Sequence, residues 1–125
     1  FRMYYSPDGK HIAIGAADML MLIDAKTLEI LDAETVHSVE QLHDSIFTPD
    51  GKYVIATSRT KRVFDDCVDP ADPKSDEYLM DGQLKLYDVG AKKFVGRPTS
   101  TCLACHDEAG VDQHAVLCGV DFNWR

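Results

Sequence analysis

The sequence lacks several features that would point to common functional classes. Thirteen Lys and Arg stand against twenty-one Asp and Glu, giving a net charge of −8, so the positive excess that attracts phosphate backbones is missing. Apolar runs are short: the longest, Met19–Ile23, has the length of a strand and not of a bilayer span. We also find no Ser-His-Asp arrangement, glycine-rich phosphate loop or pair of catalytic carboxylates. Nucleic acid and a membrane span are therefore not expected.

A tight turn occurs twice in the sequence. Pro7–Lys10 reads Pro-Asp-Gly-Lys and recurs as Pro49–Lys52, forty-two residues later, each time between two apolar runs. This is the chemistry of a β-turn in which glycine supplies a positive φ. A second pair, Leu20–Leu31 and Leu84–Val95, repeats a strand, a turn and another strand. A period near forty with four short strands per unit predicts an all-β fold of β-propeller blades.

The second unit is longer than the first. Asp8 and Asp24 are sixteen residues apart, whereas Asp50 and Asp88 are thirty-eight apart, so the second unit carries an insertion of twenty-two residues. Because the flanking strands keep the repeat, the insertion falls within residues 59–82. Loops are where β-scaffolds usually place function.

The repeat divides the chain into three parts. We expect the first blade over residues 1–41, the second over 42–99, and a loop with the first strand of a third blade over 100–125. Two blades and one strand cannot close a ring of four to eight blades. We therefore expect either a piece of a larger propeller, with the chain beginning inside a longer protein, or copies that assemble into a ring.

The turns resemble those of a known repeat family. Ser6–Lys10 and Thr48–Lys52 match a "SPDGK" turn, and Ile23-Asp24 with Thr27 matches an "IDxxT" turn. These residues resemble YVTN-type bacterial β-propeller repeats and the related large subunits of amine dehydrogenases. The resemblance covers about the first hundred residues. It implies a propeller fold and an amine dehydrogenase-like oxidoreductase, although the propeller subunits of those enzymes do not carry the cysteine motif described next.

Cys102–His106 reads C-x-x-C-H, the attachment sequence of c-type haem. Two thiols at this spacing, Cys102 and Cys105, can form thioethers with the two vinyl groups of the porphyrin. The next residue, His106, then lies where its imidazole can bind the iron as the proximal ligand. The motif sits in a connection that is seven residues longer than its equivalent in the repeat. We therefore predict one covalently bound haem c at Cys102, Cys105 and His106.

Three other interpretations of the same segment remain open. Cys102, Cys105 and Cys118 with His106 or His114 would supply four zinc ligands. A redox dithiol is a second alternative, and a structural disulfide is a third.

His114 is the nearest candidate for the sixth iron ligand. It aligns with His43 of the second unit, which favours a turn-bonding histidine like that of WD-repeat propellers over an iron ligand. Met80, in the insertion, is the thioether alternative, and an empty position would permit ligand chemistry. The remaining methionines fall in strand-like runs and are predicted core: Met3, Met19 and Met21.

The insertion is strongly acidic. Phe64–Gly82 holds seven Asp and Glu and two prolines, and clustered carboxylates of this kind suit calcium. The spacing does not match an EF-hand loop, so a solvated, proline-stiffened loop is the favoured interpretation and a docking surface the functional alternative. Cys67, in the same loop, and Cys118 are each isolated and could be buried as small apolar side chains. Export of the protein would instead permit a Cys67–Cys118 disulfide, whose connectivity the sequence alone does not decide.

Together these features predict a periplasmic c-type haem β-propeller protein that acts in electron transfer. It would be a subunit or fragment of a haem-dependent oxidoreductase, and its partners would be a redox protein or the subunits that complete the propeller. The alternative is a non-catalytic propeller interaction module with structural zinc at the Cys/His loop. A third hypothesis is a haem iron whose sixth coordination position is open and which is itself catalytic.

Overall fold

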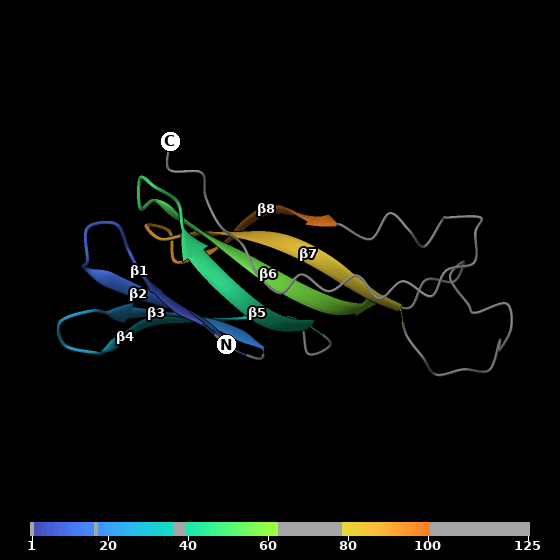
Figure 1. Cartoon of the computed structure of the whole chain (residues 1–125), viewed down its shortest axis with the longest axis horizontal. Coiled ribbons are helices and arrows are strands. Elements are labelled where there is room, and N and C mark those ends of the chain that lie inside the picture. The colour runs from blue at the N-terminus through green and yellow to red at the C-terminus, as the bar shows by residue number, and fades with distance from the viewer. Residues whose placement is uncertain (1, 17, 37–39, 63–78, 101–125) are drawn as a thin grey trace, which may run out of the picture.

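The computed structural model describes residues 2–16, 18–36, 40–62 and 79–100. These ranges form two four-stranded antiparallel sheets and contain no helix. In each sheet the strands are neighbours in chain order, as in a propeller blade, which confirms the predicted all-β fold of two four-stranded repeats (Figure 1). The predicted start of a third repeat lies outside the described residues.

The strand bounds follow the repeat. The first sheet consists of β1 (Met3–Tyr5), β2 (His11–Ala16), β3 (Met19–Asp24) and β4 (Ile30–Thr35). The second sheet consists of β5 (Glu40–Phe47), β6 (Tyr53–Arg62), β7 (Leu79–Asp88) and β8 (Lys93–Ser100).

The turn between β1 and β2 is held by one carboxylate. Asp8 Oδ1 accepts hydrogen bonds from Ser6 Oγ at 2.6 Å and from the backbone N–H of Lys10 at 3.0 Å. Ser6 Oγ in turn accepts from the N–H of His11 at 2.9 Å. Gly9 has a φ of 71°, which an L-residue with a side chain rarely adopts. The aspartate and the glycine are therefore both needed for this turn.

The turn between β5 and β6 repeats these contacts. Asp50 Oδ1 accepts from Thr48 Oγ1 at 2.6 Å and from the N–H of Lys52 at 3.0 Å. The N–H of Tyr53 donates to Thr48 Oγ1 at 3.1 Å, and Gly51 has the same φ of 71°. Threonine replaces serine without loss, because the hydroxyl is the only group used. The two turns thus share these hydrogen bonds as well as their spacing of forty-two residues.

The turns after β3 and β7 also match. Asp24 Oδ1 accepts a hydrogen bond at 2.8 Å from the N–H three residues later, and Asp88 Oδ1 does the same at 2.8 Å. Leu28 and Lys92, each four residues after its aspartate, have positive φ values of 62° and 55°. Neither turn has glycine at its left-handed position. We therefore attribute the shape of both turns to the aspartate side chain that accepts these hydrogen bonds.

The insertion lengthens a hairpin. In the first sheet the pairing of β2 with β3 ends at Ala16 and Met19. The pairing of β6 with β7 goes four pairs beyond the equivalent point, to Arg62 and Leu79. The ends of the predicted 59–82 insertion are therefore strand and not loop, because continued pairing satisfies the backbone groups in a ladder.

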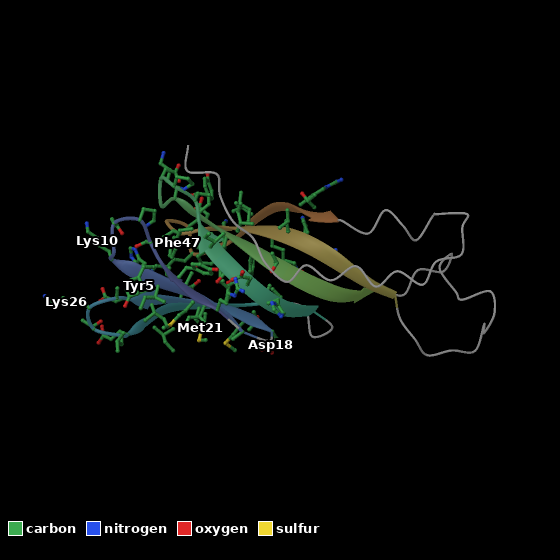
Figure 2. All side chains as sticks on the ribbon, viewed as in Figure 1. Tyr5, Lys10, Asp18, Met21, Lys26 and Phe47 are labelled. Atoms are coloured by element: carbon green, nitrogen blue, oxygen red, sulfur yellow. The ribbon has the colours of Figure 1, made fainter. Side chains whose placement is uncertain are left out.

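The core lies between the two sheets, where β5 packs against β1, β2 and β3. Both sheets turn apolar residues toward this layer, and Phe47 lies within it in Figure 2. The buried residues of the cluster are Ala13, Leu20 and Leu22 from the first sheet and Leu42, Phe47, Val54, Ala56 and Tyr87 from the second.

Tyr87 joins the sheets by a polar contact as well. Its hydroxyl donates a hydrogen bond of 2.5 Å to Asp32 Oδ2 on β4, and its ring packs edge-to-face on Phe94 with centroids 5.7 Å apart. Burial, and then the neighbouring Asp32 carboxylate, raises the pKa of Tyr87 above its ordinary value. The phenol therefore stays protonated and remains a donor at neutral pH.

The turn aspartates predict an acid dependence of stability. Hydrogen bonds from Ser6 and Thr48 lower the pKa of Asp8 and Asp50 below the ordinary value of 3.8. A folded-state pKa below the unfolded value stabilises the fold above the unfolded pKa, and this contribution is lost as pH falls through the folded pKa. The combined variant Asp8→Asn and Asp50→Asn keeps an acceptor oxygen but removes the titration.

We expect a shallower loss of unfolding free energy in this variant than in the native chain, measured by urea denaturation from about pH 5 to about pH 2. Asp18→Asn, which removes an exposed carboxylate outside these turns, is the control for the change in net charge. An equally steep acid dependence in the native chain and the combined variant would contradict the assignment.

Candidate functional site

The residues of the predicted haem motif lie outside the described residues. Ser100, at the end of β8, is the last described residue, and Cys102 follows it by two positions. The structure thus neither brings Cys102, Cys105, His106 and His114 together nor separates them. The structure describes the second sheet, whose last strand, β8, precedes the motif in the sequence.

The methionines fall in different environments. Met3 was predicted to be core, but its side chain is 64% exposed, so that prediction is wrong. Met19 and Met21 are half-buried on β3, and Figure 2 shows Met21 on the side of the first sheet that faces away from the second. Met3 is exposed because the outer side of β1 has no sheet over it in the described structure. The backbone of Met80 pairs with that of Lys61 in the hairpin.

The calcium prediction concerns mainly residues outside the described ranges. Of the seven acidic residues in Phe64–Gly82, only Asp81 is described, as a strand residue of β7 that pairs with Thr60. Within the described ranges, no three His, Cys, Asp or Glu side chains come together as metal ligands would. Calcium at the insertion therefore stays a prediction.

The described structure has a buried polar cluster, which we call the Asp44 cluster: Asp44, Ser45, Thr57 and Ser58. Its origin is a bulge in β5, where the pairing with β6 skips His43. The bulge places the fully buried Asp44 opposite Thr57, whose Oγ1 accepts a hydrogen bond of 3.1 Å from the N–H of Asp44. Asp44 Oδ1 accepts from the N–H of Ser45 at 2.9 Å. A side chain thus replaces the ladder partner that the bulge removes.

Three oxygens of the Asp44 cluster have no hydrogen-bond partner among the described residues: Asp44 Oδ2, Ser45 Oγ and Ser58 Oγ. Arg2 Nη1 lies 3.9 Å from Asp44 Oδ2. That distance is long for a direct hydrogen bond, and the Arg2 side chain is largely exposed. The cluster therefore contains one carboxylate oxygen and two hydroxyls that are buried without a partner in the part of the chain that the structure describes.

The sequence contained a signal for this cluster that our sequence reasoning did not use. Asp44 and Ser45 interrupt the apolar pattern of a strand whose other buried residues are Leu42, Ile46 and Phe47. Arg2 and Asp44 are also forty-two residues apart, so opposite charges occupy the same position of the repeat.

A shallow groove of about 270 Å³ lies between β4 and the strands β7 and β8. Apolar atoms of Val36, Phe94 and Pro98 line it together with Glu34 and Lys85. Glu34 and Lys85 beside apolar side chains do not by themselves indicate a reaction. The groove marks the outer end of the interface between the two sheets.

Comparisons with known proteins add no assignment. No protein-family model matches the chain, and no curated protein matches it in sequence. Within the four described ranges, no helical segment has the length and hydrophobicity of a bilayer span. The chemistry of the chain must therefore be argued from its own residues.

The bulge in β5 predicts that Thr57 is needed for stability. Thr57→Val keeps the shape but removes the acceptor of the buried Asp44 N–H, which we expect to cost about 1–3 kcal/mol in unfolding free energy. Thr57→Ser keeps the hydroxyl and should cost less than the valine variant. Urea denaturation at neutral pH measures both, and a valine variant as stable as the native chain would contradict this contact.

Proposed function

We propose that this chain belongs to an exported β-propeller protein that binds one haem c covalently and passes electrons to or from a partner protein. The single observation that supports it is the C-x-x-C-H sequence at Cys102–His106. The donor set suits the group, because it provides two thiols at thioether spacing and one imidazole as an axial ligand. Covalent haem of this kind would place the protein in the periplasm or an equivalent compartment.

Each residue of the motif has a separate role in the proposal. Cys102 and Cys105 anchor the porphyrin, and His106 binds the iron on its proximal side. His114 is the candidate for the distal side, with Met80 as the alternative. When bound, the haem supplies a one-electron carrier whose potential depends on the axial ligands and on burial. An amine dehydrogenase-like oxidoreductase is the setting that the repeat suggests.

In this proposal the two sheets would serve as the base from which the motif extends. β8 pairs with β7, and Phe94 at its start packs on the buried Tyr87, so the chain leaves the second sheet from an anchored strand. A covalent link can hold a cofactor that the protein surrounds incompletely. Electron transfer would then require that a partner protein approach the haem.

A spectrum of the purified protein tests the proposal. We expect a c-type pyridine haemochrome band and colour that survives acid-acetone extraction. Cys102→Ala with Cys105→Ala should remove covalent haem, whereas Cys67→Ala is a matched control outside the motif and should keep it. His106→Ala should abolish the native low-spin spectrum, since it removes the proximal ligand.

The same variants separate the alternatives. A colourless protein that contains stoichiometric zinc, and loses it in Cys118→Ala, would support the structural-zinc module and overturn the haem proposal. If the haem is present and His114→Ala leaves the low-spin spectrum unchanged, His114 is not the distal ligand.

A further inference from the structure

The shallow groove between β4 and the strands β7 and β8 lies where the second sheet leads into the cysteine motif. Val36, which follows the last residue of β4, and Pro98, two residues before the end of β8, both line the groove. Cys102 follows Pro98 by four residues, and four residues of extended chain span at most about 14 Å. A haem attached at Cys102 would therefore be held close to this end of the groove.

The groove has the composition of a small protein-docking surface. Val36, Phe94 and Pro98 give it an apolar lining, and Glu34 adds a charge beside them. The ring of Phe94 is fixed by its edge-to-face contact with the buried Tyr87. Transient protein interfaces combine an apolar centre with a polar rim, and those between electron-transfer proteins are small. The lining of the groove therefore suits a transient contact with another protein.

The charges of the chain favour a cationic partner. The net charge of −8 attracts positively charged proteins before contact. Within the groove, Lys85 Nζ lies over the ring of Phe94, 5.9 Å from its centroid. The carboxylate of Glu34 forms no ion pair within the described ranges. Glu34 is therefore the groove residue best suited to pair with a lysine or arginine of the partner.

We propose that this groove is the docking site of the electron-transfer partner, a basic protein that presents an apolar patch surrounded by lysine or arginine side chains. The inference rests on the proposed function, since the predicted haem at Cys102 is what makes contact here useful for electron transfer. One electron passes from the ferrous iron to the oxidised centre of the partner, and no bond or proton moves with it. Glu34 pairs with a cation of the partner, and Phe94 and Pro98 contact its apolar patch.

Two variants with the same change of charge separate contact at the groove from long-range attraction. Glu34→Lys reverses the charge inside the groove. Glu29→Lys makes the same reversal at an exposed position just before β4, outside the groove lining. Both variants alter the net charge of the chain equally, so long-range attraction falls by a similar amount in both. A difference between them therefore reports contact at the groove.

The first measurement is the rate of electron transfer from the full chain with its haem reduced. The acceptor is a blue copper protein of net positive charge, whose colour bleaches as the copper is reduced. We expect Glu34→Lys to lower the second-order rate constant about fivefold or more relative to Glu29→Lys, because it places a repulsion at the contact. With the small cation pentaammine(pyridine)ruthenium(III), which needs no docking surface, the two variants should differ by less than about twofold.

The second measurement is binding without electron transfer. With both proteins reduced, the copper protein is added to the isotope-labelled chain, and we expect the amide resonances of groove residues such as Val36, Val95 and Gly96 to shift. Glu34→Lys should weaken this binding more than Glu29→Lys does. The comparison reports docking directly, because no electron is transferred in it.

Three outcomes would overturn the docking site: equal effects of the two variants on the rate with the copper protein, an equally large difference with the ruthenium complex, or amide shifts that avoid the groove. If any of these occurs in a protein that carries haem and reduces the ruthenium complex, the proposed function stands and this inference alone fails. A purified protein without haem in its spectrum would overturn the proposed function and this inference with it.

Discussion

Leu20 and Leu22 of the first sheet are withdrawn from water only where the second sheet lies over them, and the rest of the fold depends on this face-to-face packing. A single four-stranded sheet has two faces and can cover neither by itself. The layer between the sheets combines apolar contact with one directional bond, from the hydroxyl of Tyr87 to Asp32. The bond fixes how β7 of one sheet sits over β4 of the other, whereas apolar packing alone would tolerate sliding.

The residues proposed to carry the redox function are separate in the sequence from those that stabilise the fold. In the described residues the polar groups mainly serve the fold: turn aspartates accept backbone hydrogen bonds, and Thr57 repairs a bulge. The residues suited to redox chemistry follow β8, which the repeat anchors. We therefore view the sheets as a repeated support, and the proposed electron transfer as a property of a segment added to it. Repeat folds commonly carry their functional residues in the connections between repeated strands.

Much of the fold could be predicted because its signals are local. Pro-Asp-Gly at Pro7–Gly9 defines a turn through the φ of glycine and an aspartate acceptor, so two copies reveal the repeat directly. The exposure of Met3 could not be predicted, since it depends on which sheet lies opposite. The bulge that precedes the buried Asp44 left only an interrupted apolar pattern as its signal in the sequence. The extension of the β6–β7 hairpin could not be predicted either, because residues 59–62 are all polar and lack the apolar alternation that indicates a strand. The Cys102–His106 motif could be found from spacing alone, but its surroundings could not.

The packing of the two sheets is tested most directly by a double-mutant cycle across them, with Asp32→Ala, Tyr87→Phe and the combined variant, measured by urea denaturation. A buried hydrogen bond to a carboxylate predicts a coupling free energy of about 1–2 kcal/mol between the two positions. A coupling below roughly 0.3 kcal/mol would mean that β4 and β7 do not meet as described, and would contradict the stacking of the two repeats.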